Sequence, residues 1–373
     1  MRARVHGRQL RSSRRTVPVV LISGVSESAM LTASISVQLG LPDTVAVRHT
    51  IDPGRQVLTR VVSDVTGVLE REEIDLEHAC VTCAIREDIL PTLERLARQG
   101  KWGSITACLP VAAEAVQVCR TLAWSPLTAP HVFVAAVVAA LDGTSVADDL
   151  LGDDLLLERH VATSREDERA VAEVGCALVE YADIVCLTEP PLAEESELIA
   201  ALARPRVPVI TDPSALNAMT LVAGIHQHPA VEAWIAEARR GRLPDLAGTE
   251  VWRLDLHSER PFHPDRFQAE LSALGGGPRR SRGCFWLPTR PGSVCVWDAA
   301  GGQASVGSTE RWHPGQRPFT RIVVTGLDDN PQEVRDAFHR CLLTDEELRE
   351  RGQIWDESWD GLEPWLGPVN RVA

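Results

Sequence analysis

Lysine is almost absent from this chain, in which Lys101 is the single lysine among 38 lysines and arginines. A phosphate-binding loop reads G-x-x-x-x-G-K-[ST], where the lysine reaches the outer phosphates and the hydroxyl holds magnesium. Such a loop follows an N-terminal strand, and the chain has no lysine before position 101. The missing lysine therefore excludes an ordinary nucleotide-hydrolysing loop at the start of the chain.

The outline of that loop is nevertheless present within residues 18–32, where an apolar run ends at Ser23-Gly24 before an expected helix. Counted from Gly24, the positions of the second glycine, the lysine and the hydroxyl hold Ala29, Met30 and Leu31. Glu27 adds a negative charge where a helix N-terminus would favour a phosphate. We predict weak or absent nucleotide binding; the alternative is a divergent loop that binds through backbone N–H groups. The degenerate loop comprises Gly24, Glu27, Ser28, Ala29, Met30 and Leu31.

Long hydrophobic runs are also missing, since none approaches the ~20 residues of a membrane helix. The basic segment 2–15 is not followed by the apolar region and cleavage site of a signal peptide. We therefore expect a cytoplasmic protein without a membrane partner. The net charge of -14 argues against free DNA binding or general RNA binding. Two local basic patches, residues 2–15 and the arginines at 279, 280 and 282, are interpreted as solvated surface.

Nine cysteines in a chain of 373 residues do not indicate a disulfide scaffold. Most lie in apolar contexts and are expected to be small buried side chains. Cys80 and Cys83 differ, because two thiolates at C-x-x-C spacing can chelate Zn²⁺, which takes about four ligands. His78 is close enough in sequence to add a third ligand. A redox pair and two buried thiols remain alternatives to the metal site.

Apolar runs alternate with amphipathic stretches over residues 16–245, which predicts an α/β domain with a mostly parallel sheet flanked by helices. The expected strands are 17–22, 44–47, 105–109, 132–141, 184–187 and 207–210, and the clearest helices are 85–99 and 165–181. Beyond a linker near 240–250, strands at 251–256, 283–288, 293–298, 304–306 and 322–325, with helices at 265–274 and 331–343, predict a smaller α+β domain. The predicted domains are a basic tail (1–15), a degenerate phosphate-loop domain (16–245), a second domain (250–345) and an acidic, tryptophan-rich tail (346–373).

Two groups of motifs carry a family resemblance. Residues 77–90 contain C-V-T-C and resemble a C-x-C-C metal motif followed by a polar helix start. The second domain contributes R-P-F-H-P at 260–264, R-G-C-F-W-L at 282–287, W-D-A-A-G-G at 297–302 and C-L-L-T-D-E-E at 341–347. Over about 16–345 the chain resembles the CobW-like branch of P-loop GTPases, a family of zinc-related metallochaperones. The resemblance implies a P-loop-type domain, a CobW C-terminal domain and Zn²⁺. It places a metal-site carboxylate in the region where His49 stands, so either His49 or His78 could complete the site of Cys80 and Cys83, with Glu77 or water.

The departures from the family pattern concern GTP. Where the family reads guanine with N-K-x-D, this chain has Leu187-Thr188-Glu189-Pro190-Pro191. The glycine that senses the γ-phosphate is replaced near Cys108-Leu109-Pro110. Phosphoryl transfer depends on positioning and on charge stabilisation by lysine and magnesium. We therefore predict that the chain is not a working GTPase and that GTP is not its cofactor.

The degenerate loop, the C-V-T-C motif and the C-terminal tryptophans together resemble an actinobacterial branch that recruits a hibernation factor to ribosomes under zinc limitation. That resemblance implies a zinc-responsive adaptor whose partners are the ribosome and a hibernation-promoting factor. The alternatives are a zinc metallochaperone that delivers metal to client proteins and an inactive paralogue with an unrelated regulatory partner.

Overall fold

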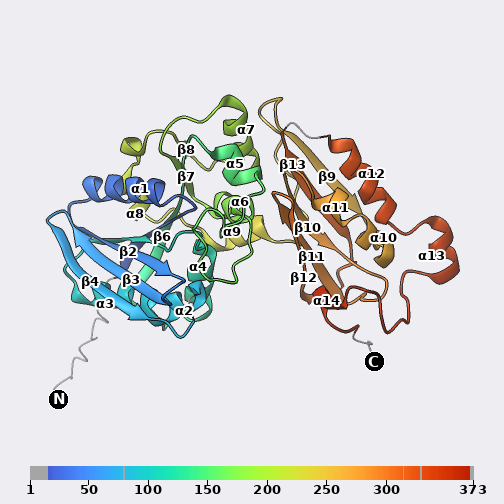
Figure 1. Ribbon diagram of the computed structural model, residues 1–373, viewed down its shortest axis with the longest axis horizontal. Helices are drawn as coiled ribbons and strands as arrows, with labels where there is room; N and C mark the ends of the chain where they lie inside the picture. Colours follow the sequence, from blue (N-terminus) through green and yellow to red (C-terminus); the bar gives the residue numbers. More distant parts are fainter. Residues whose placement is uncertain (1–15, 79, 314, 328–329, 370–373) are drawn as a thin grey trace, which may run out of the picture.

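The computed structural model describes residues 16–369 except 79, 314 and 328–329, so the basic tail predicted at 1–15 lies outside the described residues. Two β-sheets, each with its own helices, lie next to each other (Figure 1). The first sheet is built from strands before residue 211 and the second from strands after residue 251. The α/β fold with a smaller α+β C-terminal domain is thus confirmed.

The first sheet has the order β4-β3-β2-β5-β1-β6-β7-β8. Pairing is parallel from β2 across to β8, whereas β3 and β4 add an antiparallel hairpin at one edge. The strands are β1 (Val17–Gly24), β2 (Thr44–Asp52), β3 (Val57–Asp64), β4 (Gly67–Asp75), β5 (Ser104–Cys108), β6 (Val132–Leu141), β7 (Ile184–Leu187) and β8 (Val209–Ile210). The sequence did not predict β3 and β4.

Helices cover both faces of this sheet, as its nearly all-apolar strands require. Val20 and Ile22 of β1 face α1 and α8, whereas Val19 and Leu21 face α3 and α4. A third cluster joins α5, α6 and α7 to β6 and β7. The helices are α1 (Glu27–Gly40), α2 (Val81–Ala84), a π-helical turn (Ile85–Ile89), α3 (Leu90–Gln99), α4 (Ala115–Trp124), α5 (Val146–Leu151), α6 (Val171–Tyr181), α7 (Ala193–Leu202), a 3-10 turn (Pro213–Ala215), α8 (Ala218–Val222) and α9 (His228–Ile235). Of the described helices, none is both long and apolar enough to cross a membrane.

The second sheet is antiparallel, with the order β12-β11-β10-β13-β9. Its strands are β9 (Trp252–Ser258), β10 (Arg279–Phe285), β11 (Ser293–Ala300), β12 (Gln303–Arg311) and β13 (Thr320–Gly326). Its helices are α10 (Pro264–Ala269), α11 (Leu271–Gly275), α12 (Pro331–Cys341), α13 (Asp345–Arg351) and α14 (Glu363–Leu366). Leu254, Leu256, Ile322 and Val324 share the hydrophobic cluster of α10 to α12. Since side chains alternate along a strand, the intervening residues face the other way.

That second face is directed toward the first domain and corrects one expectation. Arg280 is 3% exposed and Arg282 is partly buried, and both bond Glu180 on α6. Arg279 is 4% exposed. The patch at 279–282 is therefore not solvated surface, because the neighbouring domain supplies a carboxylate that lets two of these guanidinium groups be buried.

The tryptophan-rich tail lies against the second domain for part of its length. The backbone N–H of Trp355 donates to the Pro288 carbonyl over 2.9 Å, and the Trp355 ring packs edge-on against the His263 ring. Asp360 is buried and accepts bonds from Thr289 and Arg290. Trp359 and Trp365 remain 68% and 48% exposed. The tail thus has an anchored part and two tryptophans that reach solvent.

Candidate functional site

The cysteine pair begins a helix. Cys80 is the N-cap of α2, and its thiol accepts the Cys83 N–H over 3.4 Å. Cys83 is buried, whereas Cys80 is partly exposed. The hydrogen bond with Cys80, together with burial, raises the pKa of the Cys83 thiol. The C-x-x-C spacing therefore places two sulfur donors on one turn, and one of them is reachable from solvent.

His49 lies in a separate polar cluster. It is 1% exposed in β2, and its Nε2 lies 2.9 Å from Asp88 Oδ2 in the π-helical turn. Asp88 also accepts from Arg60, whose guanidinium reaches Glu72. Burial lowers the pKa of His49 against the opposing pull of Asp88. Burial alone would raise the pKa of Asp88, but His49 and Arg60 outweigh it and keep that pKa low.

The four residues named as metal ligands are thus only partly brought together. His78 is exposed, and its carbonyl accepts the Cys80 N–H over 2.8 Å. Within the described part of the chain, no three His, Cys, Asp or Glu side chains converge as a metal site would require. Two thiols fit a borderline ion such as Zn²⁺, but a closed site needs about two more donors. Cys80 and Cys83 remain the predicted ligands, and His49 and His78 remain predictions that this geometry does not unite with them.

At the degenerate phosphate loop the chain forms helix where a loop would be needed. The phosphate-binding pattern places four residues between its two glycines, but here α1 begins at Glu27, three residues after Gly24. Ser26 caps the helix by accepting the Ala29 N–H. A Cβ added at Gly24 would lie 2.5 Å from the Ala140 carbonyl oxygen and 2.9 Å from Met30 Cγ. The space beside Gly24 is therefore filled by the chain itself.

The loop after β5 and strand β2 also contact the degenerate phosphate loop. The loop after β5 turns at Ala112, which is fully buried, and its N–H donates to the Gly24 carbonyl over 2.9 Å. Glu27 pairs with Arg48 on β2 over 3.2 Å. The cavity left here has a volume of only about 10 Å³, and His49 and Cys108 line it. A space of about 10–15 Å³ holds one water molecule, so the chain nearly fills this cavity.

The segment that stands where the family reads guanine also forms internal contacts. The Thr188 hydroxyl accepts the Gly143 N–H over 3.1 Å, and the Thr188 N–H donates to Leu141. Glu189 is exposed. In place of the aspartate that would accept hydrogen bonds from guanine, the chain has a turn whose hydrogen bonds connect the end of β7 to the end of β6. This turn therefore carries none of the Asn, Lys and Asp side chains of the guanine-reading motif.

Comparison with known proteins gives the family context. Residues 251–342 match the cobalamin synthesis protein cobW C-terminal domain. A protein of Mycobacterium tuberculosis named zinc chaperone is 27% identical, with 93% of each chain covered. A Dictyostelium discoideum protein named zinc-regulated GTPase metalloprotein activator 1 is 20% identical, covering 79% of this chain and 70% of that protein. The crystal structure of Zn(II)-bound YjiA GTPase from E. coli is a more distant likeness, with 15% identity, a TM-score of 0.35, and 88% of this chain and 100% of that chain covered.

These relatives include a protein named for zinc alone and another named for zinc and GTPase activity. The domain match lies on the part of the chain where the R-P-F-H-P and C-F-W-L motifs stand. The C-terminal part of the chain thus matches the cobW C-terminal domain, and most of the chain is similar to proteins named for zinc.

Proposed function

We propose that this protein is a zinc metallochaperone of the CobW-like type that exchanges zinc through Cys80 and Cys83 and does so without GTP turnover. The observation that carries the proposal is the two-thiol turn, with its partly exposed Cys80 and no convergent third ligand among the described side chains. A closed set of four ligands holds zinc structurally, whereas an open site accepts further ligands. An incomplete site therefore suits an ion that is cargo and is passed to a client.

The raised pKa of Cys83 gives this site a pH dependence. Zinc binds the thiolate, so binding at a thiol of raised pKa displaces a proton that is still held at neutral pH. Zinc occupancy should therefore increase with pH through the neutral range. Arg86, whose guanidinium lies 4.0 Å from Cys83 Sγ, favours the thiolate and partly offsets this effect.

Cobalt substitution tests the site. In full-length protein titrated with Co²⁺, coordination by cysteine should appear as thiolate-to-metal charge-transfer absorption, and competition with Zn²⁺ should remove that absorption. We expect the Cys80→Ser/Cys83→Ser variant to lose the signal. Cys341→Ala is the matched control, because this buried thiol lies in the other domain, where burial raises its pKa to about 12. Equal Zn²⁺ binding by the double variant and the control would refute the proposed site.

A second candidate is an adaptor that recruits a hibernation-promoting factor to the ribosome in response to zinc. The exposed Trp359 and Trp365 favour it, because aromatic side chains dominate the energetics of protein interfaces. We expect a Trp359→Ser/Trp365→Ser variant to lose co-sedimentation with ribosomes from zinc-starved cells while retaining the fold that Trp355 anchors. Zinc transfer to an apo-client with no ribosome association would favour the metallochaperone instead.

A further inference from the structure

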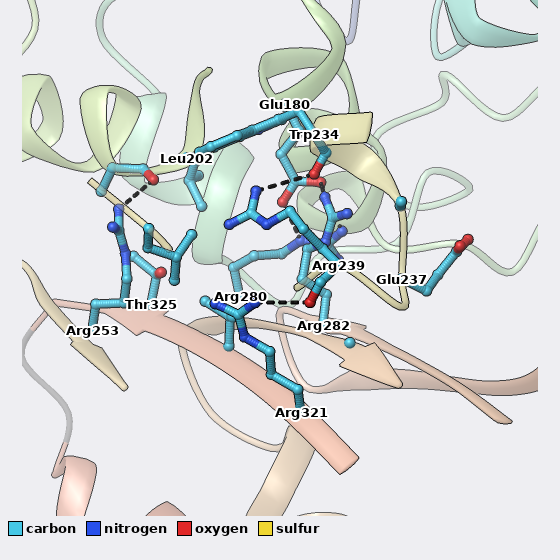
Figure 2. Close-up of a pocket in the computed structure, with 15 residues that line it drawn as sticks. Glu180, Leu202, Trp234, Glu237, Arg239, Arg253, Arg280, Arg282, Arg321 and Thr325 are labelled. Atoms are coloured by element: carbon cyan, nitrogen blue, oxygen red, sulfur yellow. Dashed lines mark hydrogen bonds and ion pairs between the residues drawn. The ribbon is translucent and has the colours of Figure 1, made fainter. Parts of the chain in front are cut away.

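A cavity rich in arginine lies between the two domains, and nothing in the zinc proposal uses it. Figure 2 shows side chains from the second sheet directed toward α6 and the segment that follows α9. Four of its arginines come from the face of β9, β10 and β13 that is turned away from α10 to α12, and the fifth comes from the linker. We call this space the arginine cavity; its five arginines are Arg239, Arg253, Arg280, Arg282 and Arg321.

Three of the five arginines are neutralised by the protein. Arg280 bonds both Glu180 and Asp298, so two carboxylates surround it. Arg282 bonds Glu180 and the Ile235 carbonyl. Arg321 forms two bonds of 2.7 Å with Asp255. Glu180 thus serves two guanidinium groups at once, which leaves no surplus negative charge for the other arginines.

Arg239 and Arg253 form no direct ion pair with a carboxylate among the described residues. Glu180 and Asp255 favour the charged form of Arg239 only from a distance. Arg239 donates to the Trp234 carbonyl over 3.2 Å and lies over the Trp234 ring at 4.2 Å. Arg253 donates to the carbonyl oxygens of Pro244 and Ala201 over 2.9 and 2.6 Å. Carbonyl groups satisfy N–H donors but do not neutralise a charge.

The surroundings make this surplus charge unfavourable. Burial, with Arg282 and Arg321 nearby, lowers the pKa of Arg239 to about 10. Burial likewise lowers the pKa of Arg253. The remaining carboxylate on the cavity wall is Glu237, and Figure 2 shows it directed away from the arginines. A half-buried cation without a counter-ion is destabilising unless something neutralises it.

We propose that the arginine cavity binds a small tetrahedral oxyanion of the phosphate type beside Arg239. Guanidinium groups bind phosphate oxygens in pairs through their planar donor fork, which is the chemistry that this wall presents. The space is about 50 Å³. Because about 10–15 Å³ holds one water molecule, the cavity has room for one small oxyanion. Because the walls belong to both domains, the anion would stabilise the arrangement of one domain on the other.

Calorimetric titration of the full-length protein in phosphate-free, low-chloride buffer tests the proposal with inorganic phosphate as the ligand. We expect saturable binding of one phosphate and a rise in melting temperature. In Arg239→Met and Arg253→Met the affinity should fall about ten- to hundredfold, as expected when one charged hydrogen-bond donor is lost. Arg98→Met is the control, since Arg98 is exposed at the end of α3 in the first domain. A parallel titration with GMP shows whether the phosphate group is bound free or as the end of a larger molecule.

In the melting experiment, the order of stability of Arg239→Met and the natural protein should reverse when phosphate is added. A purely structural role for Arg239 would not produce this reversal. Without phosphate, Arg239→Met should melt at the same temperature as the natural protein or higher, because it removes an unneutralised cation. With phosphate, the natural protein and Arg98→Met should both melt at a higher temperature than Arg239→Met. Failure of phosphate to bind would overturn the proposal, and so would equal stabilisation of all variants, which would indicate a general salt effect. Neither result depends on zinc.

Discussion

Glu180 is buried at the contact between the domains and pairs with two arginines of the second sheet, so its removal should have a large effect. Its side chain is 5% exposed, and it accepts bonds from Arg280 and Arg282. Removing one partner from a buried ion pair destabilises a protein by about 3–5 kcal/mol. In Glu180→Ala, Arg280 keeps Asp298, but Arg282 keeps only the Ile235 carbonyl. We therefore expect a loss near the lower end, about 3 kcal/mol.

Urea unfolding followed by circular dichroism measures this loss, and limited proteolysis in the linker reports whether the domains separate first. Glu180→Gln should lie between the natural protein and Glu180→Ala, because the amide retains one acceptor but no charge. Glu73→Ala is the control for an exposed pair, since Glu73 bonds Arg55 at the surface, and its effect should be much smaller. If Glu180→Ala and Glu73→Ala unfolded at the same urea concentration, the reasoning about the buried charge would be wrong.

The same residue gives a pH dependence of defined sign. Burial would raise the pKa of Glu180, but Arg280 and Arg282 outweigh burial and hold that pKa below its ordinary value of 4.5. A lowered pKa means that the folded protein binds the proton less readily than the unfolded chain. The stabilisation is therefore complete above the ordinary pKa and is lost as the pH falls through the folded value. The difference between the natural protein and Glu180→Gln should be constant at neutral pH and shrink only in acid.

Two further predictions concern the first domain. Restoring the lysine alone, as Met30→Lys, should not produce magnesium-dependent GTP binding in calorimetry, because α1 begins before position 30. Tight GTP binding by this variant would contradict the interpretation that the helix replaces the phosphate loop. Asp88→Asn should destabilise the domain by about 1.5–3 kcal/mol, since it weakens charged hydrogen bonds to His49 and Arg60. An unchanged melting curve would show that this cluster contributes nothing.

The parallel strands could be predicted because both of their faces are buried, which makes the sequence continuously apolar. The hairpin β3–β4 escaped prediction for the opposite reason. Its outer strand carries Glu70, Arg71, Glu72 and Glu73, whose charges protect a sheet edge and erase the apolar signal of a strand. The helix expected over 165–181 begins only at Val171, because Ala170 is extended and forms a β-bridge with Leu155.

The functional residues likewise divide into those that the sequence could predict and those that it could not. The C-x-x-C spacing was enough to single out Cys80 and Cys83 as two thiols that could chelate one ion, because both donors are local in sequence, and that metal site stays a prediction. The buried arginines could not be predicted in the same way. Arg280 is buried because Glu180, 100 residues earlier in the chain, neutralises it. A run of arginines gives no indication of that partner, and the ordinary expectation for such a run is exposure.

At the degenerate phosphate loop, the change in backbone structure is larger than the replaced residues alone indicate. Ser26 is a favourable N-cap, and Glu27 places a negative charge in the first helical turn, where the helix dipole stabilises it. No glycine stands between Gly24 and Gly40, so residues 25–30 lack the backbone freedom that a wide loop around a phosphate uses. Met30 then packs beside Gly24 in the space that would have been left. The replacements that remove the lysine and the second glycine are thus the same ones that favour a longer helix. Loss of the lysine and second glycine and gain of a packed helix are therefore one structural change, and reversing it requires rebuilding the loop as well as its charge.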